Sequence, residues 1–403
     1  MHFCHEYRLF MRPDRRSKRQ SHLEYYQQHG IAPVRYDLSS LDAHFDRRRS
    51  LYNKLGLASL AFTGMKVLEV AAGTGHNSLY VSAQLPETLV LLEPNPAAIQ
   101  HIRSTYAGFQ QPHTSPALIT DKLEDFQPAE TYDIVLCENW LGTSPHERGL
   151  LLKLVGFLHR GGVLVITTVS PIGFVPNLLR RYFSCHIAAP SLSFDKRTEI
   201  LESAYGPHLE KLGAMTRNLT DWVHDNMMNP AYFGLCLSAP AVLELMGDRL
   251  EVLGAYPSFV EDWRWFKGLH GDVRAINQHF LSEYWRKCHN FLDSRHTPTL
   301  GDRDSNQTLE EAAKALLLAI EASEDAVLNA GDVQQSIAAV GGRFAVFANL
   351  IPEDFVDARA GFAEIAPLVL SPAKATVGVI AGLSEFNSLF GRETSYLALQ
   401  RAR

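Results

Sequence analysis

Two glutamates and a glycine turn carry the most specific chemical signal in the sequence. Glu69 lies within a short apolar run of the buried-strand type, and the turn that follows contains Gly73 and Gly75. Small residues in such a turn let a ligand approach the backbone closely, and the free N–H groups that begin the next helix favour an anionic group. A second apolar run ends at Glu93, where a carboxylate can accept hydrogen bonds from both hydroxyls of a ribose. The stretch 66–95 therefore predicts a nucleotide-binding crossover.

The turn departs from the dinucleotide-binding pattern in two ways. Ser78 stands where the pattern G-x-G-x-x-G has its third glycine. Glu69 lies in the first strand, where its carboxylate would repel a pyrophosphate. A cationic ligand suits these residues better.

The pattern E-x-A-x-G-x-G from Glu69 to Gly75, with a second acid at Glu93, resembles motif I and its sequel in the class I S-adenosylmethionine-dependent methyltransferases. The donor used by that family carries an ammonium, a sulfonium and a ribose diol but no phosphate. Ala71 stands where many members carry glycine. The resemblance implies an α/β fold with a doubly wound, seven-stranded Rossmann-like sheet and a helical amino-terminal segment over the cofactor pocket, and the length of 403 residues adds large helical insertions.

The resemblance also implies which residues bind S-adenosyl-L-methionine. They lie in the glycine turn, at the end of the second strand, after the third strand, where an acid meets the adenine, and at the end of the fourth strand. The predicted cofactor-binding residues are Glu69, Ala71, Gly73, Gly75, Asn77, Glu93, Pro94, Asp121, Lys122, Leu123, Glu138 and Asn139.

Short apolar runs alternate with helical patterns along the first two thirds of the chain. The runs predict parallel strands at 67–70, 89–92, 117–119, 132–137, 162–168 and 249–255. A strand-like segment at 394–400 is predicted to be the antiparallel seventh strand, beside the fifth. Thr308 to Glu311 has the pattern of a capping box and predicts a helix from there to about Ser323. The helical block would then be an insertion between strands six and seven.

Four parts of the chain are predicted from these patterns. Residues 1–62 form an amino-terminal helical lid segment, and residues 63–256 form the cofactor-binding core, with a substrate-lid insertion at about 171–235. Residues 257–390 form a helical insertion or accessory lobe, and residues 391–403 form the final strand.

The acceptor side is less specific in sequence. A base, if one is used, is shortlisted from His146, His224, Asp225 and Asp262, although a lone histidine or aspartate is more often a cap or a surface group. Predicted substrate-binding residues are Tyr36, Trp140, Trp222, Asn226 and Trp263. The segment around Tyr36 can be a lid or a packed connection, and the segment around Trp222 can be a pocket wall or a capped surface helix.

Composition narrows the partners and the location. The formal net charge is −6, and the one basic run, 12–19, has the composition of a solvated tail, so we expect no nucleic-acid partner. No apolar run approaches membrane-spanning length and no secretory signal is present, which predicts a cytoplasmic protein without a membrane partner. The five cysteines show no metal-ligand spacing, so no metal is expected. The carboxy-terminal helices offer a possible homodimer contact.

The predicted function is S-adenosylmethionine-dependent N- or O-methylation of a small-molecule acceptor by direct displacement. Two alternatives stay open at this point. One is an enzyme that uses the same cofactor without methylating, by aminocarboxypropyl transfer or cyclisation. The other is a binding or scaffold protein with a degenerate pocket.

Overall fold

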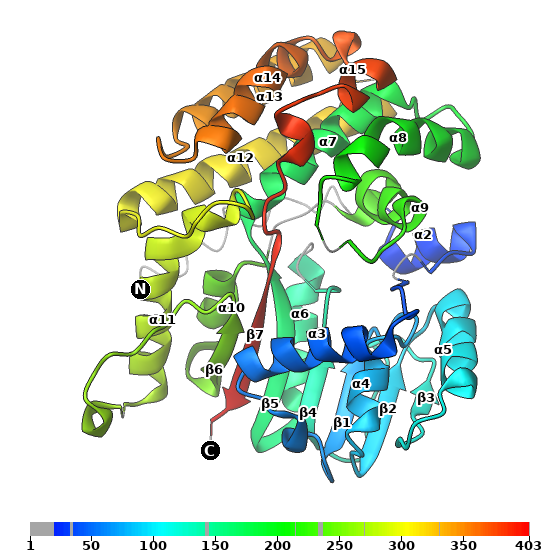
Figure 1. Ribbon diagram of the computed structural model, residues 1–403, viewed down its shortest axis with the longest axis vertical. Coiled ribbons are helices and arrows are strands. Elements are labelled where there is room, and N and C mark those ends of the chain that lie inside the picture. Colours follow the sequence, from blue (N-terminus) through cyan, green and yellow to red (C-terminus); the bar gives the residue numbers. More distant parts are fainter. Residues whose placement is uncertain are drawn as a thin grey trace.

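The computed structural model describes residues 20–32, 35–141, 145–213, 215–232, 237–269, 271–329 and 331–402. Figure 1 shows a twisted sheet in the lower half of the view and a helical lobe above it. The basic run 12–19 lies outside the described residues. Within the described part, no helix is both long and apolar enough to cross a membrane.

Seven strands form one sheet in the order β3-β2-β1-β4-β5-β7-β6. Neighbouring strands are parallel except for β7, which is antiparallel to both β5 and β6. This confirms the predicted fold class and the predicted place of the seventh strand beside the fifth. The strands are β1 (Lys66–Val70), β2 (Thr88–Leu92), β3 (Ala117–Ile119), β4 (Tyr132–Cys137), β5 (Leu158–Val169), β6 (Leu250–Tyr256) and β7 (Thr394–Arg401).

The central strands are buried on both faces, and successive side chains enter different cores. In β1, Leu68 and Val70 belong to the larger core, whereas Val67 belongs to a smaller core on the other face. This alternation follows from the two-residue repeat of a strand. The smaller core is covered by α3 (Leu41–Lys54), α4 (Ser78–Ala83) and α5 (Pro96–Gly108), and the larger by α6 (Pro145–Gly156) and α10 (Ala239–Met246).

The helical lobe is built from both insertions. Helices α7 (Pro171–Ile187) and α8 (Phe194–Leu209) pack against α12 (Arg303–Leu328) and α15 (Val377–Ala381), respectively, so segments far apart in the sequence share one core. The predicted insertion between the sixth and seventh strands is confirmed, since α12 to α15 lie between β6 and β7 in the chain. The remaining helices are α2 (His22–His29), α9 (Leu219–Trp222), α11 (Val273–Lys287), α13 (Val333–Asn349) and α14 (Val356–Leu370).

Helix α12 begins earlier than its sequence pattern predicts. Asp302 is the N-cap and accepts a hydrogen bond from the backbone N–H of Ser305, so the helix starts at Arg303. Thr308 lies inside the helix and donates to the carbonyl of Asp304. The predicted capping box at Thr308 is therefore wrong, because an aspartate earlier in the chain caps the helix.

Candidate functional site

The glycine turn lies at the carboxyl end of β1, beside the end of β2. Gly73 and Gly75 have φ angles of +58° and +76°, which glycine adopts without strain. A Cβ atom added at Gly73 would meet nothing within 4 Å, so the backbone there faces open space. Ala71 also has a positive φ, of 57°, a backbone conformation that is energetically unfavourable for a residue with a Cβ atom.

Glu93 is tied to this turn from the end of β2. One carboxylate oxygen accepts the N–H of Gly73 at 2.8 Å, and the other accepts the N–H of Asn95 at 2.9 Å. The side chain is 6% exposed, so it does not point into solvent. Each carboxylate oxygen keeps a second lone pair, which leaves acceptors for a diol.

Glu69 is buried in β1 without a full set of partners. Its Oε2 atom has no hydrogen-bond donor among the described residues. Burial, followed by the nearby charge of Glu138, raises the pKa of Glu69 to about 7. Burial likewise raises the pKa of Glu93 to about 7, against the effect of its two backbone donors. An orphaned, buried carboxyl oxygen above an open glycine floor fits a cationic ligand that also carries a diol, as S-adenosylmethionine does.

Glu138, predicted to bind the cofactor, is already paired with a cation of α3. Arg48 of α3 donates through Nη2 to both carboxylate oxygens at 2.7 and 2.8 Å, and Tyr52 donates to Oε1 at 2.8 Å. Both side chains of the ion pair are less than a tenth exposed. This contact fastens α3 across the end of β4, and Arg48 is not among the residues that the sequence predicted for the site.

Asn139 continues from β4 and connects it to β5 and β7. It has φ of 55°, and its backbone N–H donates to the Thr167 hydroxyl at 2.7 Å. Its side-chain amide donates to the phenol oxygen of Tyr396 at 3.4 Å. Sequence reasoning missed Tyr396. The signal that could have found it is the antiparallel direction predicted for the seventh strand, which brings the first residues of that strand to the carboxyl edge of the sheet.

Tyr36 lies over the glycine turn. Its backbone N–H donates to Nδ1 of His76 at 3.0 Å, and Nε2 of His44 lies 3.0 Å from the His76 carbonyl oxygen. Tyr36 also forms a β-bridge with Arg217 from the helical lobe. Burial lowers the pKa of His44 and of His76 to about 4, so both imidazoles are neutral at pH 7. The segment around Tyr36 is thus a connection packed between the sheet and the lobe.

The remaining predicted cofactor residues lie around the same edge. Asn77 precedes α4, and Pro94 follows Glu93. Asp121 and Lys122 are exposed just beyond β3, whereas Leu123 is 3% exposed and belongs to the larger core. The position of Asp121 and Lys122 is compatible with a ligand contact, and the burial of Leu123 leaves it a packing role.

Two residues proposed for the acceptor side are core residues of the helical lobe. Trp222 is 5% exposed and packs against Tyr205, and Asn226 is buried with its amide bound to the carbonyl of Trp222. A substrate role for these two side chains is contradicted by this packing. Trp140, by contrast, is half-buried at the end of β4.

Two of the residues shortlisted as a base, Asp225 and His224, are bound to other side chains. Asp225 accepts hydrogen bonds from Arg217 at 2.6 Å and from the Tyr26 phenol at 2.5 Å. Burial raises its pKa, but Arg217 and Tyr26 outweigh burial and the pKa ends below its usual range. His224 contacts the Thr198 hydroxyl at 3.1 Å, and burial lowers its pKa. Both groups hold the lobe together. His146 lies on α6, and its side chain is outside the described residues.

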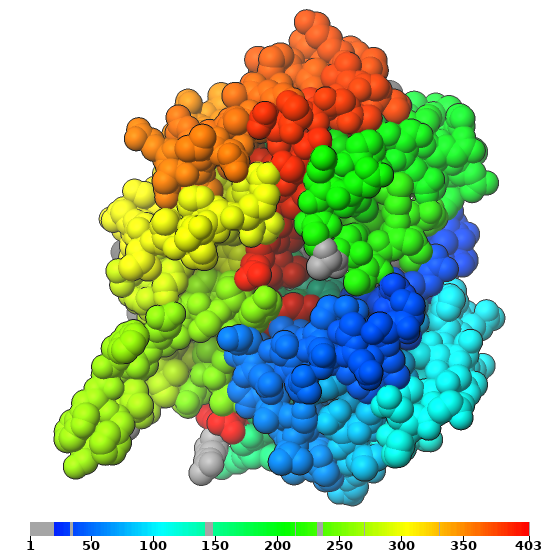
Figure 2. Space-filling view, in the orientation of Figure 1, coloured from blue at the N-terminus to red at the C-terminus, as the bar shows by residue number. Residues whose placement is uncertain are grey.

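Asp262 and Trp263 lie on an arm between β6 and α11. The arm projects from the body of the molecule at the lower left of Figure 2, and Trp263 is 90% exposed. Asp262 is ion-paired with Arg264, whose hydrogen bonds lower the pKa of Asp262 to about 2. The prediction that these two residues face the pocket is wrong, because the chain leaves the sheet after Tyr256.

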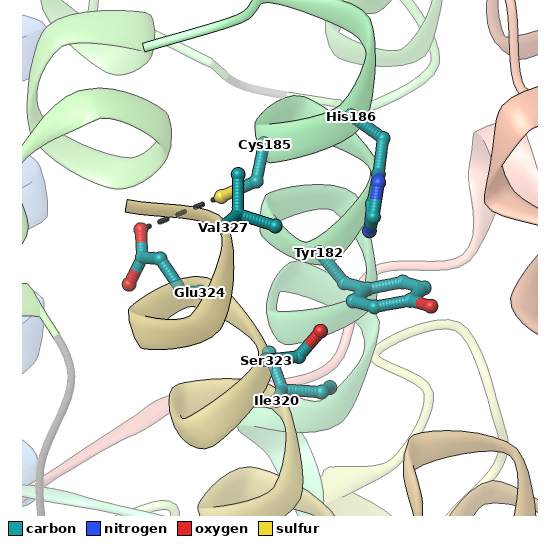
Figure 3. A pocket seen from close by; sticks show the side chains of 7 residues that line it. All are labelled: Tyr182, Cys185, His186, Ile320, Ser323, Glu324 and Val327. Carbon is teal, nitrogen blue, oxygen red and sulfur yellow. Dashed lines mark hydrogen bonds between the residues drawn. The ribbon is translucent and has the colours of Figure 1, made fainter. Parts of the chain in front are cut away.

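Two hollows elsewhere do not belong to this site. Figure 3 shows the first, between α7 and α12, where the Cys185 thiol meets Glu324 at 3.5 Å; it has no room for a water molecule. Burial raises the pKa of Cys185, so its thiol is unreactive. The second, of about 580 Å³, is lined by residues 127–131 with Lys153, Gly156 and Phe157. It lies at the amino ends of β4 and β5, the opposite edge from the glycine turn.

The sheet order, the glycine turn and the two buried glutamates define an open α/β fold with a candidate nucleoside site at its carboxyl edge. A family model described as a methyltransferase domain matches residues 43–202, a range that contains the turn, both glutamates and Arg48. The match and the sheet order support a class I S-adenosylmethionine-dependent methyltransferase domain in this part of the chain, with S-adenosylmethionine as the methyl donor. The comparison with curated proteins finds no match.

Solved structures also match part of the chain. The N-methyltransferase NodS from Bradyrhizobium japonicum WM9, in complex with S-adenosyl-L-homocysteine, is 21% identical; the match covers 36% of this chain and 74% of NodS, with a TM-score of 0.29. Magnesium protoporphyrin IX methyltransferase from Synechocystis PCC 6803, with S-adenosylmethionine bound, is 14% identical over 36% of this chain and 74% of its own, with a TM-score of 0.30. Likeness at this level assigns no acceptor to this chain.

Proposed function

We propose that this protein methylates a nitrogen or oxygen atom of a small molecule that binds between the carboxyl edge of the sheet and the helical lobe. The observation that carries the proposal is the pair of buried glutamates, Glu69 and Glu93, beside the open backbone of Gly73. Figure 2 shows a hollow in the middle of this face, between the blue amino-terminal segment and the green and yellow lobe. The enclosure and the acidic rim favour a small acceptor over a nucleic acid.

Bound S-adenosylmethionine would supply an activated methyl group: the acceptor lone pair bonds to the methyl carbon as the carbon–sulfur bond breaks, leaving S-adenosylhomocysteine. Glu93 would accept hydrogen bonds from the ribose hydroxyls through its free lone pairs. Glu69 would face positive charge, which would offset the cost of burying its ionised form. The open floor at Gly73 lets the donor lie against the backbone.

On the acceptor side, the protein's main contribution would be alignment. Tyr36, Asn139 and Tyr396 converge at the end of β4, where their polar groups can orient an acceptor. Nδ1 of His76 already accepts the N–H of Tyr36, so this neutral imidazole has no lone pair to offer there as a base. An acceptor that presents its own lone pair, such as an uncharged amine, would need only positioning and exclusion of water.

Calorimetric titration of S-adenosylmethionine into wild type and Glu93→Gln tests the donor site. We expect wild type to bind, and the variant to bind about ten-fold more weakly or worse, because charge-assisted hydrogen bonds to the diol are lost. Glu87→Gln, at an exposed glutamate on the other edge of the sheet, is the matched control and should bind like wild type. Equal affinity in wild type and Glu93→Gln would contradict the proposal.

The spent cofactor tests the reaction. S-adenosylhomocysteine is the product of methyl transfer, whereas methylthioadenosine would mean that the aminocarboxypropyl arm had been transferred or cyclised. Mass spectrometry of the two nucleosides after turnover with a pool of small amines and phenols therefore separates the two chemistries.

A further inference from the structure

Arg392 is held rigidly just before β7. Its N–H donates to the carbonyl of Phe291 at 2.7 Å, and the carbonyl of Glu393 accepts the N–H of Ser170 at 2.7 Å. A Cβ atom added at Gly173 would lie 2.0 Å from the Arg392 carbonyl oxygen, so only glycine permits this approach of the chain to α7. The backbone is fixed by three elements, which sets the direction in which the side chain leaves.

The Arg392 side chain lies against Tyr256 at the end of β6. Its guanidinium carbon is 4.9 Å from the centre of the Tyr256 ring, and Nη2 is 3.5 Å from the phenol oxygen. Within the described ranges, Arg392 forms no salt bridge with a carboxylate, although it is only partly exposed. Three buried or half-buried arginines do have one, since Arg48 pairs with Glu138, Arg181 with Glu324 and Arg217 with Asp225, whereas the buried Arg180 donates to backbone carbonyls instead.

Neighbouring residues connect Arg392 with the proposed acceptor side of the site. Tyr256 is directly opposite Tyr396 in the antiparallel β6–β7 pair, so the two side chains share a face of the sheet. Tyr396 in turn meets the amide of Asn139. Figure 2 shows the red carboxy-terminal segment on the floor of the hollow described above. A row of neighbouring side chains therefore runs from the end of β4 to the guanidinium of Arg392.

We propose that Arg392 binds the acidic group, a carboxylate or a phosphate, of the acceptor. This inference rests on the proposed function and names the class of its substrate. Tyr396 and Tyr256 would flank the body of the acceptor. The acid would lie on the order of 15 Å from the methylated atom, since β4 and β6 are three strands apart and neighbouring strands are about 5 Å apart. A planar guanidinium without a carboxylate partner presents a fork of donors that matches either anion.

Binding of small aromatic probes to the S-adenosylhomocysteine-saturated protein tests the proposal. The probes are 3-phenylpropanoate, 4-hydroxybenzoate and phenyl phosphate, with the primary amides of the two acids as neutral partners. We expect at least one anion to bind about ten-fold more tightly than the neutral probes. Whether the carboxylates or phenyl phosphate bind more tightly tells which acidic group the acceptor carries. Arg392→Gln should remove the preference, and Arg392→Lys should keep part of it.

Three controls keep the outcome interpretable. Arg274→Gln changes an exposed arginine of α11 and should leave every affinity as in wild type. Tyr256→Phe keeps the aromatic ring beside the Arg392 guanidinium and removes only the phenol oxygen. It therefore changes the surroundings of Arg392 without changing its charge. Affinity for S-adenosylhomocysteine and the melting temperature should be unchanged in all of these variants, which excludes misfolding.

The contrary results are distinct. No preference for any anion in wild type, or a preference that survives in Arg392→Gln, would overturn the role of Arg392 while leaving methyl transfer intact. Failure of the wild-type protein to bind S-adenosylhomocysteine at all would instead overturn the proposed function, and this inference with it.

Discussion

Buried acidic side chains have cation partners in the helical lobe but not in the cofactor slot, which is the glycine turn with Glu69 and Glu93. In the lobe, Asp221 and Asp225 pair with Arg35 and Arg217. In the slot, Glu69 and Glu93 form no salt bridge with any described residue, and burial raises the pKa of each to about 7. An ion pair holds segments together, whereas a buried carboxyl without a cation is costly unless a ligand brings the charge. The comparison separates acids that maintain the fold from acids kept for a ligand.

Glu138 shows the rule within the slot itself. It lies at the same edge as Glu69, and the two carboxyls are near enough for Glu138 to raise the pKa of Glu69. Arg48 neutralises Glu138, so only Glu69 is left to face a cationic ligand. Helix α3 thereby reduces the charge at the edge of the sheet and fixes its own position by the same contact.

Removing the cation from the buried pair should have the largest effect. Arg48→Ala leaves Glu138 buried and unpaired, and we expect unfolding to become easier by about 3–5 kcal/mol in urea denaturation. Arg274→Ala, in an exposed pair, is the control and should change little. Replacing both partners, with Arg48→Met and Glu138→Leu, should recover most of the lost stability. A single variant as stable as wild type would show that the pair does not fasten α3.

Removing the charge from a buried acid that has no cation partner should increase the stability of the ligand-free protein. The pKa of Glu69 is raised from an ordinary value of 4.5 to about 7, so its contribution to stability is full below pH 4.5 and is lost as the pH rises through 7. Glu69→Gln should therefore stabilise the ligand-free protein at pH 8, by on the order of 2 kcal/mol, and little at pH 4.5. Thermal unfolding at the two pH values measures this, and a uniform loss of stability would contradict it.

Binding of S-adenosylmethionine should have the reverse pH dependence. Glu69 must be ionised to face the cationic donor, and Glu93 must be ionised to accept both hydrogen bonds of the diol. Affinity should therefore weaken as the pH falls below about 7, by about ten-fold per pH unit for each group that takes up a proton. Calorimetry between pH 5.5 and 8.5 tests this, with the slope halved in Glu69→Gln. A flat profile would mean that neither carboxyl meets the cation.

The slot was predictable from sequence because its parts are close in the chain. Glu69, Gly73 and Gly75 lie within seven residues, and Glu93 follows at the end of the next strand. The direction of the seventh strand was predictable as well, from the resemblance to a known sheet. Local patterns and the known course of a fold carry this information without any tertiary detail.

Arg48 and the proposed acceptor side were not predictable, because these residues meet their partners only through the tertiary fold. Arg48 comes from a helix before the sheet, and Tyr396 and Arg392 come from the end of the chain. Their local sequences resemble any helix surface or strand start. The prediction for Asp262 and Trp263 was wrong because it relied on local composition. An aromatic and acidic run has the composition of a pocket wall, but composition does not tell whether a loop turns inward or projects into solvent.

Ala71→Gly should give the smallest effect and refine the comparison at the floor of the slot. Ala71 adopts a φ of 57°, which costs a residue with a Cβ atom roughly 1–2 kcal/mol, while glycine costs about 0.4–1 kcal/mol more in unfolded-chain entropy. The substitution should therefore stabilise the protein by between zero and about 1.6 kcal/mol, measured by urea denaturation of the ligand-free form. It adds no charge and removes no hydrogen bond, so the pH profile of S-adenosylmethionine binding should keep its slope. If that slope changed, the geometry of the turn, rather than the ionisation of Glu69 and Glu93, would control the affinity of the slot.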